Sequence, residues 1–239
     1  MSDTPEALTQ QLLDAAIAAG AEACDALVVS GTSLSIEVRE GALEQAERSE
    51  GLDLGLRVLI GHRQANVSIS VARPDAIREM AERAVAMAKE APEDPYIGLA
   101  DPSQLAQIRD AETLELFDPT AEPDPATLKA DALACEAAAK AVSGVSQVQS
   151  ATSGYSANDV WMAASNGFSG GYRRTSRGTY CTAIAGTGDS MERDYDGDSQ
   201  VFVSDMRSAD DIGRAAGQRA VDRLNARQPK TGAYPVLFD

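Results

Sequence analysis

The feature that most constrains the fold of this chain is the pair Asn166-Gly167, which lies between two runs of alternating apolar and polar residues. Asn-Gly is the strongest short-range signal for a β-hairpin, because both residues tolerate the positive φ that a type I′ turn requires. A long second strand is expected from about Gly171 to Ala185, and a polar segment with three carboxylates and one guanidinium follows from Gly186 to Tyr195. The sequence therefore predicts a long antiparallel hairpin that ends in a dense group of charges.

The same stretch carries a family resemblance. The hairpin, the long strand and the charged segment from Gly188 to Tyr195 follow one another in an order and spacing that resemble the TldD/PmbA family, most closely its PmbA (TldE) branch. Segments similar to the family's opening sheet and connecting segment are Leu34–Arg39, Gly41–Glu44, Gly55–Val58, Asp94–Asp101 and Leu114–Pro119. The resemblance covers effectively the whole chain, and the family's chains continue well past residue 239. We therefore expect this chain to be truncated before a C-terminal domain.

Helix and strand signals occur in the same order in the two halves of the chain. Each half begins with a helix, continues with strands whose apolar residues alternate, and closes with a second helix. The helices start near Thr4, Pro74, Asp124 and Ser208, and the strands include Leu34–Arg39, Leu52–Ile60 and the region from Val145 to Val203. This repeat predicts an α+β fold in which helix, antiparallel strands and helix occur twice. The two units are expected to share one continuous sheet, with the helices on one face.

The repeat divides the chain into four segments. We expect residues 1–91 to form the first helix–strands–helix unit and residues 92–123 to form a connector rich in proline. Residues 124–228 are expected to form the second unit. Residues 229–239 are apolar and strand-like, and are predicted to start a strand that leads to a missing C-terminal domain.

Charge and cysteine content exclude several classes of function. A formal net charge of −16 would repel phosphates over most of the surface, so neither nucleic acid nor a membrane is expected as a direct partner, whereas a cationic peptide would be attracted. Because the sequence shows neither a membrane span nor a signal peptide, we expect a cytoplasmic protein. Cys24, Cys135 and Cys181 are far apart in the sequence, and none belongs to a Cys-x-x-Cys motif. We therefore expect them to be reduced and buried.

Candidate metal ligands are few. His62 follows a strand and has no second histidine or glutamate four residues later, so a turn residue is a better interpretation than a zinc ligand. Asp194, Asp196 and Asp198 alternate as in a calcium-binding loop, but Ser199 stands where that loop needs glycine. A solvated acidic turn is the preferred interpretation of these carboxylates. We therefore expect no metal site, no catalytic residue and no cofactor in this chain.

Two groups of residues are candidates for contacts with other molecules. The resemblance implies a partner interface or substrate channel lined by Asn166, Gly167, Glu192, Arg193, Asp194 and Tyr195. Arg173 and Arg177 form the second group, because they share one face of the expected strand. The second group has no interleaved aromatic residues and no positive field around it. An ion-paired sheet surface is therefore preferred to a nucleic-acid platform.

The resemblance also implies a function. It identifies the chain as the N-terminal, non-catalytic part of a PmbA/TldE-type subunit in a cytoplasmic zinc-dependent peptidase assembly that processes unfolded or leader-bearing peptides. A TldD-type partner would supply the zinc, or the chain would self-associate through the family's dimer. Sheet edges could capture peptides, since backbone pairing accepts many sequences. Two alternatives stay open: the full-length chain is itself a zinc metallopeptidase, or it is a free-standing peptide- or calcium-binding module.

Overall fold

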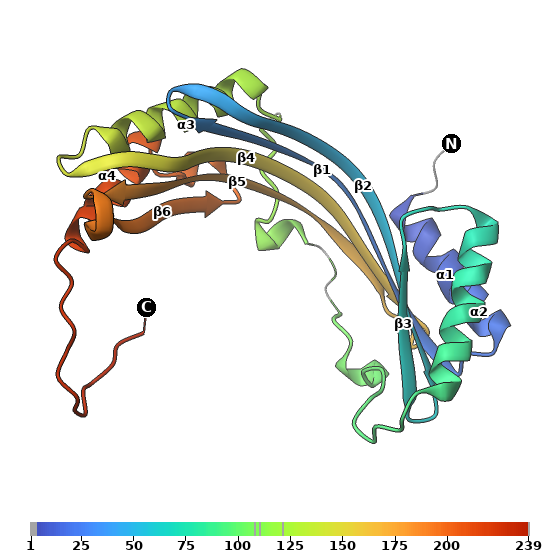
Figure 1. The fold of residues 1–239 in the computed structure, drawn as a ribbon. Helices are drawn as coiled ribbons and strands as arrows, with labels where there is room; N and C mark the ends of the chain where they lie inside the picture. The colour runs from blue at the N-terminus through green and yellow to red at the C-terminus, as the bar shows by residue number, and fades with distance from the viewer. Residues whose placement is uncertain (1–3, 108, 110, 121, 239) are drawn as a thin grey trace.

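The computed structural model describes residues 4–107, 109, 111–120 and 122–238. The chain forms helix, three strands and helix, and then repeats this order after a connector (Figure 1). The first unit contains α1 (Pro5–Ala19), β1 (Ala23–Arg39), β2 (Ala42–Ile60), β3 (Arg63–Ile69) and α2 (Pro74–Glu90). The second unit contains α3 (Pro125–Lys140), β4 (Val145–Ala164), β5 (Ser169–Ala185), β6 (Glu192–Gln200) and α4 (Ala209–Asp222). Short 3-10 helices are η1 (Pro102–Gln104), η2 (Glu112–Leu114), η3 (Gly188–Ser190) and η4 (Val203–Asp205).

The strands form one antiparallel sheet of six, in the order β3-β2-β1-β4-β5-β6. The two units meet in its centre, where β1 pairs with β4 in a register that runs from Asp25 opposite Ala164 to Val38 opposite Ala151. The prediction of an α+β fold whose two units share one continuous sheet is therefore confirmed.

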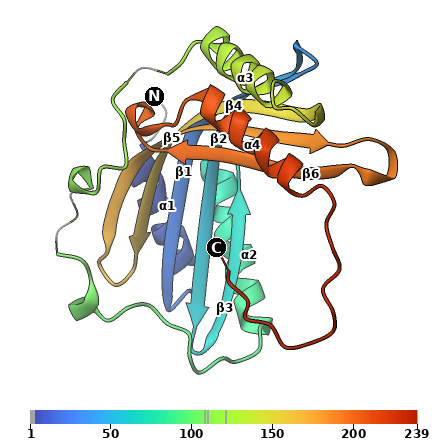
Figure 2. The same cartoon turned by 90° about the vertical axis from the view of Figure 1, so that its left-hand side faces the viewer.

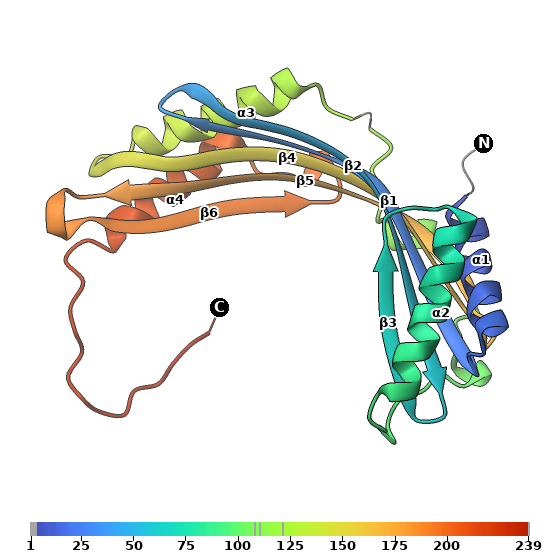
Figure 3. The ribbon, with the colours of Figure 1, turned by 45° about the vertical axis from the view of Figure 1, so that its right-hand side comes forward.

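The α-helices of the described residues cover one face of this sheet, as predicted. The side chains of β1 that enter the core beside α1 and α2 are Cys24, Ala26 and Val28, and those in the core beside α3 and α4 are Leu34, Ile36 and Val38. All six have even numbers, and the side chains of a strand alternate between its two faces. Both helix pairs therefore pack on the same face. This is the convex face of the arch that the sheet forms (Figure 1 and Figure 3).

Each helix pair closes a separate core over one end of the sheet. The first core includes the fully buried side chains of Leu12, Leu54 and Met80. The second core, beside α3 and α4, is rich in alanine. Within it α4 approaches α3 so closely that a Cβ added to Gly213 would lie 2.0 Å from the carbonyl oxygen of Cys135. A residue without a side chain therefore sets the separation of these two helices.

The helix ends agree with the capping signals in the sequence. Thr4, Asp124 and Ser208 each accept a hydrogen bond from a backbone N–H in the first turn of the helix that follows. Gly20 ends α1 in the left-handed conformation, with a φ of 103°. These residues satisfy backbone groups that a helix end leaves without an intrahelical partner.

The turn between β4 and β5 forms a hairpin, as predicted, but the predicted type I′ geometry is wrong. Gly167 has a φ of 93°, whereas Asn166 is not among the residues with positive φ. The N–H of Gly167 donates to the carbonyl of Ala164, and the N–H of Ala164 donates to the carbonyl of Phe168. Ser165 therefore extends the loop to three residues, and in such a loop the last residue alone takes the left-handed conformation.

A two-residue turn with positive φ at both positions joins β1 to β2 instead. Glu40 and Gly41 have φ values of 54° and 76°. The buried carboxylate of Glu136 on α3 accepts the N–H of Gly41 at 2.8 Å. Its other oxygen forms an ion pair of 2.7 Å with the ammonium of Lys140. Burial raises the pKa of Glu136, but Lys140 and the Gly41 N–H outweigh burial and hold this pKa below its usual value. Helix α3 thus fastens the tip of the hairpin.

Some segments differ from the sequence-based expectation. The strands β1 and β2 begin well before Leu34 and Leu52, where the alternation of apolar residues becomes clear. From Ala42 to Gly51, β2 is exposed on both faces, so no core selects apolar residues there. Residues 229–238 form no strand and lie mostly exposed, and their continuation into a further domain stays a prediction. Within the described part of the chain, no helix is long and apolar enough to cross a membrane.

Candidate functional site

The concave face of the sheet is the face that carries no α-helix. On β1 it is formed by the odd-numbered residues from Asp25 to Glu37, and the register extends the same face across the other strands. Figure 2 looks onto this face in the first unit, where α1 and α2 lie behind the strands. The arch therefore presents a broad backbone surface whose side chains are not used to hold helices.

Glycine residues gather on the concave face. They are Gly31, Gly51, Gly55, Gly154, Gly170, Gly178 and Gly197. A Cβ added to Gly197 would lie 2.1 Å from Cδ1 of Tyr180, and one added to Gly31 would lie 2.2 Å from Oδ1 of Asn158. Side chains on the inner side of a bent sheet crowd one another, and glycine removes this crowding. Gly31 and Gly197 therefore relieve crowding where the sheet curves, whereas a Cβ at Gly51 would meet nothing within 4 Å.

Hydroxyl groups and tyrosine rings border hollows on the concave face. One hollow of about 230 Å³ lies over Gly154 and Gly178, and its polar border is Ser35, Thr152, Ser156, Ser176, Tyr180 and Ser199. A second, of about 200 Å³, shares Ser156 with it and is bordered by Ser33, Ser49 and Asn158. The side chains of Tyr172, Tyr180 and Tyr195 are among the exposed large side chains of the chain. Hydroxyls that both donate and accept match an extended polypeptide, whose backbone offers both kinds of group.

The charged segment that was predicted to line a channel is the start of β6, and its side chains divide between the two faces. Arg193 and Tyr195 lie on the concave face, and Tyr195 is 66% exposed. Glu192 and Asp194 lie on the convex face, where Asp194 accepts a hydrogen bond from Arg223. Two of these four side chains are therefore placed to meet a molecule inside the arch.

Asn166 and Gly167 lie at the opposite end of β5. This strand has 17 residues, which at about 3.3 Å per residue corresponds to roughly 55 Å along the chain. Asn166 fastens the connector to the turn, because its Nδ2 donates to the carbonyl of Ala100 at 2.8 Å and its Oδ1 accepts the N–H of Phe168. The structure therefore does not bring the predicted channel residues together in one site.

The alternating aspartates of β6 bind arginine residues on the convex face. Asp196 is 5% exposed and forms ion pairs with Arg207 at 2.8 Å and Arg219 at 3.3 Å. Asp198 accepts the backbone N–H of Arg207 at 2.8 Å. The interpretation as a solvated acidic turn is wrong, because a strand places these carboxylates on one face, under α4. Their arginine partners occupy the oxygens that the calcium hypothesis required.

The basic residues of β5 pair with carboxylates of the same chain, as predicted. Arg173 lies 2.7 Å from Asp159 of β4, and its guanidinium lies over the ring of Phe117, 4.2 Å from the ring centre. Arg177 is 7% exposed and forms an ion pair of 2.6 Å with Asp131 on α3. Both arginines therefore stabilise the convex side of the sheet.

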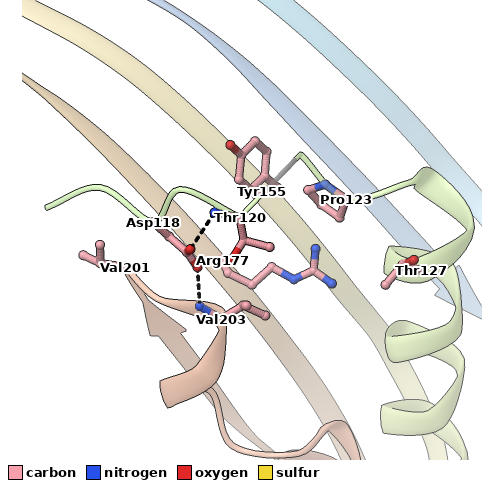
Figure 4. Close-up of a pocket in the computed structure, with 8 residues that line it drawn as sticks. All are labelled: Asp118, Thr120, Pro123, Thr127, Tyr155, Arg177, Val201 and Val203. Carbon is pink, nitrogen blue, oxygen red and sulfur yellow. Dashed lines mark hydrogen bonds between the residues drawn. The ribbon is translucent and has the colours of Figure 1, made fainter.

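A cavity of about 240 Å³ lies where the connector crosses the convex face, and no motif in the sequence indicated it (Figure 4). Its lining is Asp118, Thr120, Pro123, Thr127, Tyr155, Arg177, Val201 and Val203. The carboxylate of Asp118 accepts the N–H groups of Thr120 at 2.8 Å and Val203 at 2.9 Å. Hydrogen bonds from Thr120, and then from Val203, lower the pKa of Asp118. This buried carboxylate thus ties the connector to the segment before α4.

The donor set does not fit a zinc ion. Within the ranges that the structure describes, no group of three or more His, Cys, Asp or Glu side chains is placed to hold a metal. The three cysteines are buried and unbridged, as predicted. Burial raises the pKa of Cys24 to about 11, and a hydrogen bond with Cys181, followed by burial, raises that of Cys135. Protonated thiols are poor metal ligands. His62 lies exposed in the turn between β2 and β3.

Comparison with known proteins identifies relatives over most of the chain. Residues 24–88 match the model of PmbA/TldA metallopeptidase domain 1, and residues 118–224 match that of the PmbA/TldA metallopeptidase central domain. The chain is 27% identical over 217 residues to metalloprotease PmbA of Escherichia coli O157:H7, which covers 91% of this chain and 48% of the relative. It is 30% identical over 231 residues to the metalloprotease PmbA homolog of Haemophilus influenzae, covering 95% and 49%. The chain thus spans about half the length of these relatives.

Solved structures share the fold. A putative modulator of DNA gyrase from Bacteroides thetaiotaomicron matches with a TM-score of 0.80 and 21% identity, over 94% of this chain and 51% of that one. TldE from Thermococcus kodakarensis matches with a TM-score of 0.69 and 16% identity, over 90% and 47%. The two domain models match successive parts of the chain, residues 24–88 and then residues 118–224. The chain therefore belongs to the PmbA/TldD metallopeptidase family.

Proposed function

We propose that this chain is the N-terminal half of a PmbA/TldE-type subunit, and that its concave face encloses an extended peptide inside a cytoplasmic, zinc-dependent peptidase assembly. The observation that carries the proposal is that no α-helix of the described residues covers the concave face. Connector residues Ala106, Arg109 and Leu114 line a pocket against one part of this face, beside Leu27 and Met162. Every α-helix of the described residues packs on the convex face, which leaves the concave face of the arch available to another molecule.

The chemistry of this face supports a peptide rather than a small ligand. Serine, threonine and asparagine side chains line neighbouring hollows, and the tyrosine rings beside them offer contact area without demanding one particular side chain. The net charge of −16 favours peptides that carry basic residues. Such a surface would hold unfolded or leader-bearing peptides of varied sequence, which is the substrate class that we propose.

The proposal assigns no catalytic residue to this chain. The described residues offer no donor set for zinc. On the family resemblance, a TldD-type partner is proposed to hold the metal and to cleave the peptide. The role of this half is to bind and orient the substrate. A subunit with this role would raise the affinity of the assembly for peptide and would be inactive when purified alone.

Reconstitution tests the division of labour. The complete protein that contains this chain should be purified alone, and also with a TldD-type partner, and each sample assayed for zinc content and for cleavage of unfolded casein. We expect zinc and activity to follow the partner and activity to require both proteins. Stoichiometric zinc together with cleavage by the complete protein alone would overturn the proposal in favour of a self-sufficient metallopeptidase.

Photocrosslinking tests the concave face itself. A benzophenone amino acid at Tyr195, on the concave face, should crosslink to bound casein peptides in the assembly. The same group at Gln218, which is exposed on α4 of the convex face, is the matched control and should not crosslink. Equal crosslinking from both positions would contradict enclosure of the peptide by the arch.

A further inference from the structure

The outer edge of β2 is unpaired over most of its length. Strand β1 pairs with β2 from Ala42 to Leu59, whereas β3 pairs with it only from Leu54 to Ile60. A free edge therefore runs from Ala42 to Asp53. It contains no proline, and its irregularity in register lies at its start, next to the hairpin turn. A long, regular edge of this kind is a template for pairing with another strand.

The hydrogen bonds of β1 show which peptide groups of β2 face outward. The carbonyl of Cys24 on β1 accepts the N–H of Ser165 on the β4 side. Backbone groups alternate in direction along a strand, so even-numbered residues of β1 point to β4 and odd-numbered ones point to β2. The register pairs odd with odd residues as far as Glu37 and Gln45. The outward residues of β2 are therefore Ala46, Arg48, Glu50 and Leu52, whose backbone groups have no partner among the described residues.

The side chains beside this edge are acidic on the concave side. Glu47 lies there, and its contact is a long hydrogen bond of 3.5 Å from Gln45. Glu37 of β1 lies on the same face, directly across from Gln45. On the convex side Arg48 is already paired with Glu50 at 3.0 Å and with Glu122. A strand added at this edge would therefore meet unneutralised carboxylates on one of its two faces.

We propose that the free edge of β2 is a docking site for an extended segment of a partner protein that carries lysine or arginine at alternate positions. The segment adds one strand to the sheet through the outward N–H and C=O groups from Ala46 to Leu52. Its basic side chains project to the concave side, where Glu47 and Glu37 attract them. A second copy of this chain is a poorer occupant, because its own edge is acidic and like charges across strands repel. The inference uses the edge and not the concave surface, so it stands apart from the proposed function.

A proline substitution separates docking from folding. Ala46→Pro removes an outward N–H and leaves the hydrogen bonds to β1 in place, and edge strands accept proline at such positions. Ala46→Val keeps the N–H and is the matched control. Ser49→Pro removes an N–H that faces β1, so it should lower the melting temperature, which checks the assigned direction of the backbone groups. The probe is a fluorescein-labelled peptide in which lysine alternates with valine and threonine, and its binding to the 239-residue chain is followed by anisotropy.

We expect the unchanged chain and Ala46→Val to bind the lysine peptide, with an affinity that falls as salt is added. Ala46→Pro should keep its melting temperature and lose roughly tenfold or more in affinity, equivalent to about 1.4 kcal/mol. Glu47→Lys, which tests the same site without proline, should weaken binding of the lysine peptide and strengthen binding of a glutamate counterpart. Unchanged binding by folded Ala46→Pro, or no effect of Glu47→Lys, overturns the proposal. A concentration-dependent dimer that Ala46→Pro abolishes would also overturn it, because the occupant would then be a second copy.

Discussion

The substitution Gly213→Ala should destabilise this chain, although alanine is the better helix former. An added Cβ would lie 2.0 Å from the carbonyl oxygen of Cys135 and 2.9 Å from its carbonyl carbon. A carbon atom and a carbonyl oxygen normally stay about 3.3 Å or more apart, so α4 would have to move by more than about 1 Å away from α3. The obstacle is backbone, which cannot rotate aside as a side chain could.

The expected size follows from two opposing effects. Overpacking of a close-packed interface costs about 1–3 kcal/mol, whereas the helix propensity of alanine over glycine returns about 1 kcal/mol in a helix interior. Because the clash is with backbone at a buried position between α3 and α4, we expect the upper part of the overpacking range and a net loss of about 2 kcal/mol. For a chain of this size that corresponds to a melting temperature lower by roughly 4–8 °C.

Urea unfolding followed by far-ultraviolet circular dichroism measures this loss. Gly217→Ala is a graded companion, because its Cβ would lie 2.8 Å from Cγ2 of Val142, a side-chain atom that can yield, and 2.9 Å from the carbonyl oxygen of Ala139. It should cost less than Gly213→Ala. Gln218→Ala, at an exposed position of the same helix, should change the free energy of unfolding by less than about 0.5 kcal/mol. An increase in the free energy of unfolding for Gly213→Ala would refute the reasoning, because helix propensity would then outweigh the clash with Cys135.

Three further outcomes are expected. Gly167→Val should cost on the order of 1 kcal/mol or more in urea unfolding, because valine disfavours the φ of 93° that ends the β4–β5 loop. Asp196→Ala should lower the free energy of unfolding by about 1.5–3 kcal/mol, because it leaves two arginines without their buried partner. Arg193→Ala, on the concave face, should change it by less than about 0.5 kcal/mol. Equal losses of stability in the two variants would contradict the assignment of these side chains to opposite faces. The pKa of Glu136 is lower in the folded chain than its ordinary value of 4.5, so ionised Glu136 stabilises the folded state. This contribution to the free energy of unfolding is complete at pH values above 4.5 and is lost as the pH falls through the lowered pKa. Glu136→Gln should remove that part of the acid sensitivity, which a series of unfolding curves between neutral and acidic pH would show.

The sequence by itself determined the local features of this protein. Thr4, Asp124 and Ser208 start helices and Gly20 ends one, because a cap is satisfied within a single turn of chain. The alternation of Leu34, Ile36 and Val38 predicted a strand with one buried face, since the period of a strand is a local property. The repeated order of helix, strands and helix was enough to predict one shared sheet with its helices on one side.

The tertiary structure decided which distant residues share a face. The alternate spacing of Asp194, Asp196 and Asp198 is compatible with both a metal-binding loop and a strand. Asp196 forms its ion pair with Arg219 only because the fold places α4 above β6. Asp118 carries no motif, since its hydrogen bond to Val203 joins segments 85 residues apart. Gly31, Gly154 and Gly178 are scattered in the sequence, and only the strand register gathers them on the concave face. The pairing of distant strands determines which residues lie together on the concave face. The alternation of residues within one strand does not indicate which residue of a neighbouring strand lies opposite.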